Sequence, residues 1–98
     1  MKLIYQQRGG GAIGYHLLLS WQGSWPIGKL EIYTDQVILL VWPFKSVLKI
    51  KDIDSIKKIW WDGLRINHHG PNVPYLVFFP FTPEVVAAFR KIGVKLTE

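Results

Sequence analysis

The feature that most constrains the fold of this chain is a series of short alternating apolar runs, followed by one amphipathic helical stretch. Turn-forming residues separate the runs at close intervals, which is typical of strands joined by tight turns. Several short strands closed by a C-terminal helix predict a mainly β domain, a small barrel or sandwich. The predicted strands are Ile27–Thr34, Gln36–Trp42, Ser46–Ile50, Ser55–Trp61, Gly63–His68 and Tyr75–Phe81.

The residues of Pro83–Ile92 are expected to form the helix that plugs one end of the barrel. Thr82 is suited to the N-cap, and the proline after it occupies the first turn, where its missing N–H costs nothing. Apolar residues at i, i+4 and i+7 from Val85 form one stripe, in which Phe89 is predicted to be buried deepest. Gly93 is a natural residue to end the helix.

The pair Asp62–Gly63 is the strongest short-range turn signal. An Asp-Gly pair between two apolar runs favours a type I′ hairpin, which requires positive φ at both residues. We therefore expect Gly63 to have a positive φ.

The N-terminal third has a weaker pattern. Met1–Gln7 is either a short strand or a loose tail, and in the second case the loosely ordered segment extends over residues 1–12. The three glycines of Arg8–Gly11 predict a break. Ile13–Trp21 is read as a strand, and Gln22–Pro26 as a turn.

Composition limits the class of protein. The 98 residues predict a single domain, 1–98. The chain has no cysteine, which excludes disulfides, thiolate catalysis, cysteine-ligated zinc and iron–sulfur clusters. The sequence shows no signal peptide and no apolar run of about 20 residues that could span a membrane. We therefore expect a soluble, cytoplasmic protein.

No group of residues predicts an enzyme, a metal site or a cofactor. Asp52 and Asp54 flank a turn, where aspartate commonly bonds to the local backbone. His68 and His69 are adjacent on a strand and face opposite ways, so they cannot share one metal without distortion. We therefore expect no catalytic residue, no metal and no cofactor.

The net charge of +5 raises the possibility of an anionic partner. Alternatively, the positive charge serves only to keep the protein soluble. The lysines that gather in one stretch, and so form the candidate anion surface, are Lys45, Lys49, Lys51, Lys57 and Lys58.

Trp60 and Trp61 are consecutive on a predicted strand, so one points inward and the other outward. The outward ring is either covered within the chain or part of an interface, since tryptophan is enriched at binding hot spots. It could also stack on a base, with the lysines contacting phosphates, and the same lysines could meet an anionic lipid surface.

The chain also resembles bacterial pleckstrin-homology-like (PH-like, GRAM-like) domains. The resemblance rests on Trp25–Ile32, on Val47–Ile56, on Gly63–His68 and on the helix that ends at Gly93. It implies a strongly bent, partly open barrel of about seven strands with one end plugged by the helix. The lipid-binding relatives carry basic residues around the first hairpin turn, whereas Thr34–Gln36 has none, so inositol-phosphate binding is not implied.

These observations predict a non-catalytic interaction or scaffolding module that self-associates or binds a protein. Val37–Trp42 and Tyr75–Phe81 are apolar on both faces, and a barrel wall buries only one, so the other needs a cover. Met1–Trp21 could supply part of it, and a second copy the rest. The alternative is binding of an anionic ligand, nucleic acid or a lipid headgroup, through the lysine surface.

Overall fold

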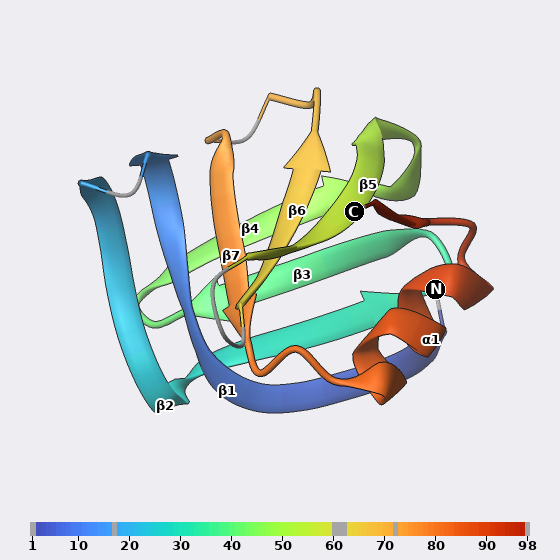
Figure 1. Ribbon diagram of the computed structural model, residues 1–98, viewed down its shortest axis with the longest axis horizontal. Helices are drawn as coiled ribbons and strands as arrows, with labels where there is room; N and C mark the ends of the chain where they lie inside the picture. Colours follow the sequence, from blue (N-terminus) through green and yellow to red (C-terminus); the bar gives the residue numbers. More distant parts are fainter. Residues whose placement is uncertain (1, 17, 60–62, 72, 98) are drawn as a thin grey trace.

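The computed structural model describes residues 2–16, 18–59, 63–71 and 73–97. Within these ranges the chain is mainly β with one α-helix near the C-terminus, which confirms the predicted class (Figure 1). The helix α1 spans Pro83–Lys91, and a short 3-10 turn, η1, spans Ile50–Asp52. The strands are β1 (Leu3–His16), β2 (Leu19–Tyr33), β3 (Gln36–Val41), β4 (Phe44–Lys49), β5 (Ile53–Ile59), β6 (Gly63–His68), β7 (Tyr75–Phe79) and β8 (Leu96–Thr97).

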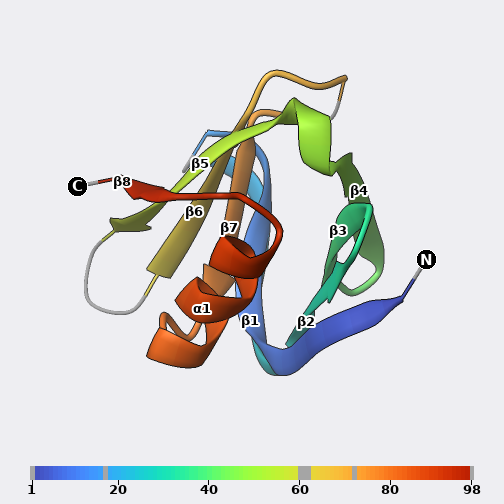
Figure 2. The ribbon, with the colours of Figure 1, turned by 90° about the vertical axis from the view of Figure 1, so that its right-hand side faces the viewer.

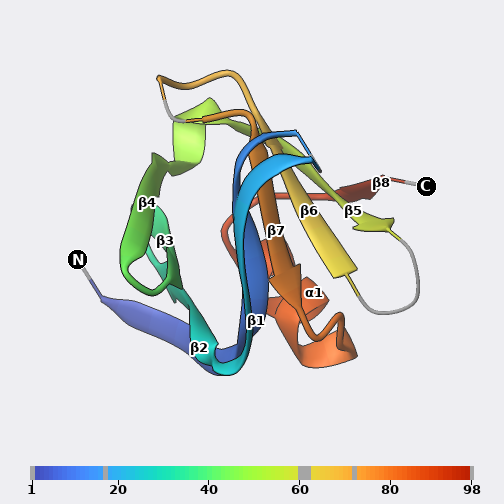
Figure 3. The same ribbon diagram turned by 90° about the vertical axis from the view of Figure 1, so that its left-hand side faces the viewer.

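The described strands form one eight-stranded sheet in the order β4-β3-β2-β1-β7-β6-β5-β8. Neighbouring strands are antiparallel, except that β8 runs parallel to β5. The order begins and ends on different strands, so the sheet is not closed into a barrel. It is bent instead, with β3 and β4 on one side of the molecule and β5 and β6 on the other (Figures 2 and 3).

Strand β1 joins the two halves of the sheet. It pairs with β2 along most of its length and with β7 from Gly10 to Gly14. The glycines let the strands cross closely: a Cβ on Gly9 would overlap the carbonyl oxygen of Phe79, and one on Gly28 would lie 2.6 Å from the carbonyl carbon of Gly10. The glycine run therefore marks a tight crossing inside a strand.

In the N-terminal third, the strand alternative for Met1–Gln7 is confirmed from Leu3 on, and four other predictions are wrong. From Leu3 on, strand β1 replaces the loosely ordered segment predicted for residues 1–12, and it passes through Arg8–Gly11 without the predicted break. The predicted strand Ile13–Trp21 contains the end of β1 and the start of β2. The predicted turn Gln22–Pro26 lies within β2, where the pairing with β1 has a register shift, or bulge.

The core lies between the two halves of the bent sheet and is closed by the helix. Thr82 caps α1, since its hydroxyl accepts a hydrogen bond from the Val85 amide at 3.2 Å, and Gly93 follows the helix with φ of +87°. Phe89 is fully buried, as predicted. Other fully buried core residues are Leu30, Leu39, Leu48, Ile56, Leu64, Ile66, Leu76, Phe78 and Val85.

The prediction for the β5–β6 turn is wrong at Gly63. This residue is the first of β6 and pairs with Ile59, so it lies in the β5–β6 ladder and not in a turn. Among the described glycines only Gly93 has a positive φ. The other half of the predicted turn, Asp62, lies outside the described residues.

The single helix of the described ranges is too short to cross a bilayer, and no candidate membrane-spanning helix is found there.

Candidate functional site

The lysines predicted to form an anion surface are all exposed, but they fall into two groups. Lys45 and Lys49 project from β4, at one end of the strand order, and Lys51 lies in η1. Lys57 and Lys58 lie on β5, next to last at the other end. The sheet order therefore divides a set that the sequence presents as one stretch.

The predicted interface tryptophans, Trp60 and Trp61, lie outside the described residues. The structure instead exposes Trp21, Trp25 and Trp42, which are 48%, 71% and 66% accessible. A signal in the sequence could have found the first two, because Gly9–Gly28 contains no Asp, Glu, Lys or Arg. Exposed strand edges are normally protected by charged residues, and this stretch of β1 and β2 has none.

Exposed apolar side chains gather where the tip of the β1–β2 hairpin lies beside the β3–β4 turn. The Trp21 indole Nε1 donates a hydrogen bond to the Trp42 carbonyl at 2.9 Å, and its ring meets Phe44 edge-on at a centroid distance of 5.6 Å. Figure 3 views the molecule from this side. We call this surface the aromatic end; its residues are Tyr15, Leu18, Leu19, Trp21, Trp42 and Phe44.

The aromatic end is hollowed by a cleft of about 410 Å³. The side chains that line it are mostly apolar, and Leu18 at its rim is 90% exposed. Val73, from the loop between β6 and β7, also lines it. The cleft has the composition of a docking site for an apolar side chain.

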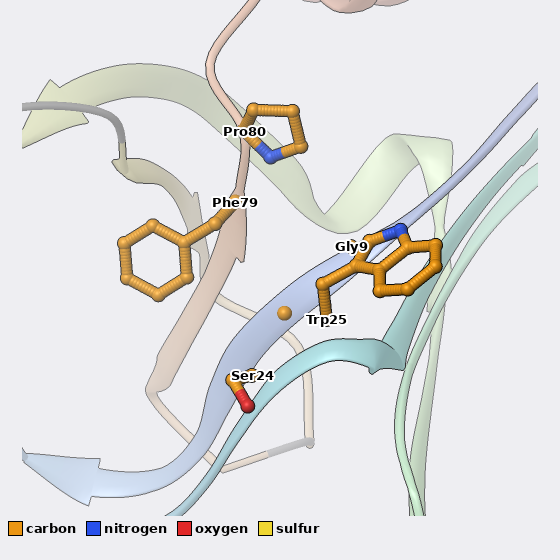
Figure 4. A pocket seen from close by; sticks show the side chains of 6 residues that line it. Gly9, Ser24, Trp25, Phe79 and Pro80 are labelled. Carbon is orange, nitrogen blue, oxygen red and sulfur yellow. The ribbon is translucent and has the colours of Figure 1, made fainter.

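A second cleft, of about 430 Å³, lies where β1 crosses β2. Trp25 and Phe79 stand on opposite sides of β1, with Gly9 beside the Trp25 ring, and Pro80 closes one end (Figure 4). Its lining is almost entirely apolar, although Arg8 lies close by and donates a hydrogen bond from Nη1 to the Pro26 carbonyl at 3.3 Å.

The outer faces of β3 and β7, from which the sequence predicts uncovered apolar surface, are largely covered within the chain. Val77 is fully buried and Tyr75 is 6% exposed, packed with Ala12. On β3, Ile38 is 9% exposed. The uncovered apolar surface lies at the aromatic end instead.

The outer face of β5, β6 and β7 also carries a basic pair. Lys57 and Arg65 are directly opposite each other in the β5–β6 ladder, and the guanidinium carbon of Arg65 lies 5.2 Å from the centroid of the Tyr75 ring. Burial raises the pKa of the Tyr75 phenol above its ordinary value, and the charge of Arg65 opposes this rise. The hydroxyl therefore keeps its proton at neutral pH.

The aspartates and histidines near η1 make local contacts. Nδ1 of His69 lies 2.7 Å from the Asp54 carboxylate, and its Nε2 lies 3.9 Å from that of Asp52. His68 contacts the Val73 carbonyl instead, at 2.9 Å. Among the described residues there is no group of three or more side chains suited to a metal ion.

No family model, no curated protein and no solved structure matches the chain. Function is therefore inferred from the two apolar clefts and the basic pair.

Proposed function

We propose that this chain is a non-catalytic interaction module that associates, with a second copy or with another protein, through the aromatic end. The observation that carries the proposal is the gathering of Leu18, Leu19, Trp42 and Phe44 in one place, each at least half exposed. Large contiguous apolar patches on a small protein typically mark an interaction site. Tryptophan is the residue type that contributes most often to such contacts.

The arrangement of the strands supports a pleckstrin-homology-like module as the framework for this site. The order β4-β3-β2-β1 continues into β7-β6-β5, and the helix after β7 packs into the shared core. This agrees with the bent, partly open structure that the resemblance in sequence implies. In this framework the aromatic end is formed by the β1–β2 hairpin tip and the β3–β4 turn, neither of which is needed to close the core.

Sedimentation equilibrium at micromolar concentration tests the proposal. We expect the wild-type protein to self-associate or, if the partner is another protein, to be monomeric and to capture that partner by way of the same residues. Trp42→Gln should weaken the association by about 2 kcal/mol or more, roughly 30-fold in dissociation constant, which is the range for an interface hot spot. Leu18→Gln should act in the same direction.

Trp25→Gln is the matched control, because Trp25 is as exposed as Trp42 but lies outside the aromatic end. It should leave the association unchanged. Equal weakening by Trp25→Gln and Trp42→Gln would show that general hydrophobicity drives the association. A wild-type protein that stays monomeric and whose partners are retained by Trp42→Gln would also contradict the proposal.

A further inference from the structure

The outer face of β1–β4 carries a row of three basic residues. In the strand ladders Arg8 lies directly opposite Lys29, and Lys29 lies opposite Leu40. Leu40 in turn lies opposite Lys45. Residues directly opposite each other project from the same face of a sheet, and Leu39, the preceding residue on β3, is fully buried in the core, so the row points away from the core. Three strand spacings of about 4.8 Å make the row about 14 Å long.

We call Arg8, Lys29 and Lys45 the basic row, and most of its charge has no acidic partner. Lys29 forms an ion pair with Glu31 at 3.2 Å between Nζ and Oε2. Arg8 and Lys45 are exposed, and neither forms an ion pair with a carboxylate in the part of the chain that the structure describes. Like charges directly opposite each other, as at Arg8 and Lys29, destabilise a sheet. A polyanion lying along the row would offset this repulsion.

The cleft at Trp25 adjoins the Arg8 end of the basic row. The hydrogen bond from Arg8 Nη1 to the Pro26 carbonyl, at 3.3 Å, holds the guanidinium beside the segment that contains Trp25. The Trp25 side chain is 71% exposed, and it lines the cleft together with the backbone of Gly9 and Gly10 (Figure 4). Because these glycines have no side chains, a planar ring can stack on the indole while an anion attached to it reaches Arg8.

We propose that this face binds a single strand of nucleic acid, with phosphates along the basic row and a base stacked on Trp25. Proteins that bind single strands without sequence preference combine a basic track for the backbone with aromatic side chains on which bases stack. A free phosphate would complement only the basic row, and an apolar peptide only the cleft. The site differs from the aromatic end in its residues, and it does not depend on self-association.

The test is fluorescence anisotropy of a labelled oligothymidylate of about eight nucleotides, titrated with the full chain at several salt concentrations. We expect saturable binding. The logarithm of the association constant should fall with the logarithm of the salt concentration at a slope of about −2, since each of three phosphate contacts on a single strand contributes about −0.7. Trp42→Gln should bind the strand as the wild type does, whereas a loss of binding there would place the strand at the aromatic end and contradict the proposal.

Four variants separate the parts of the site. Arg8→Gln and Lys45→Gln should each weaken binding and make the slope shallower by about 0.7. Trp25→Ala should weaken binding about tenfold, as expected for the loss of a stacked base, and leave the slope unchanged. Lys57→Gln is the matched control: it removes an exposed charge from β5, in the other half of the sheet, and should change neither the affinity nor the slope.

Any of four results would overturn the proposal. The first is the absence of saturable binding of the oligothymidylate. The second is an equal change of slope in Lys45→Gln and Lys57→Gln, which would show attraction to the net charge rather than a site. The third is an unchanged affinity in Trp25→Ala, since no base would then stack on that ring. The fourth is binding to vesicles of phosphatidylserine and phosphatidylcholine without binding of the oligonucleotide, which would assign the face to a lipid surface.

Discussion

Gly63 and Gly93, both in the C-terminal half of the chain, are required for different physical reasons. A Cβ on Gly93 would meet no atom within 4 Å, so only its φ of +87° excludes other residues. Gly63 has no such φ, but a Cβ there would lie 3.0 Å from both Ile59 Cγ1 and Phe79 Cε1. The local Asp-Gly signal correctly indicates a reversal of the chain, but it assigns the wrong reason to Gly63.

We predict that Gly63→Val destabilises the domain by about 1–3 kcal/mol, because the added carbons overpack the space between Ile59 and Phe79. The measurement is the urea midpoint of unfolding. The double variant Gly63→Val/Ile59→Ala should recover part of the loss, since it removes one of the two neighbours. A midpoint for Gly63→Val equal to that of the wild type would show that the side chains give way without cost.

At the scale of the element, the helix could be predicted from the sequence and the two longest strands could not. The N-cap, the apolar stripe and the C-terminal glycine of α1 all lie within the short segment from Thr82 to Gly93. The structure confirms each of them. The formation of strands β1 and β2, in contrast, depends on pairing with segments that are distant in the sequence. The glycines at 9–11 fit a strand because it passes close to Phe79 and Gly28, and no local pattern contains that information.

The helix yields a prediction about stability. Phe89 is fully buried in the core, so Phe89→Ala should cost about 3–5 kcal/mol, a large share of the stability of a small domain. Chemical denaturation measures the loss. Arg90→Ala, one residue on and exposed, should change the free energy of unfolding by less than about 0.5 kcal/mol. Similar midpoints for the two variants would mean that the helix does not close the core.

At the scale of the whole molecule, the sequence indicates a need for an interface but misplaces it. Strand β7 has apolar residues on both faces, and both are covered within the chain. On the outer face Val77 is fully buried, and Arg65 covers the Tyr75 ring. The exposed surface arises instead from the meeting of Trp21 with the β3–β4 turn. That meeting depends on how the sheet bends, which composition and periodicity do not specify.

The net charge of the molecule gives the last prediction, which concerns salt. Each copy carries +5, so two copies repel each other while the aromatic end, which is apolar, attracts. Raising the ionic strength from about 0.01 M to about 0.1 M shortens the Debye length from about 30 Å to about 10 Å and so screens the repulsion without weakening apolar contact. Self-association measured by sedimentation equilibrium should therefore tighten as salt is added. If self-association instead weakens as salt is added, charged side chains, and not the aromatic end, hold the copies together.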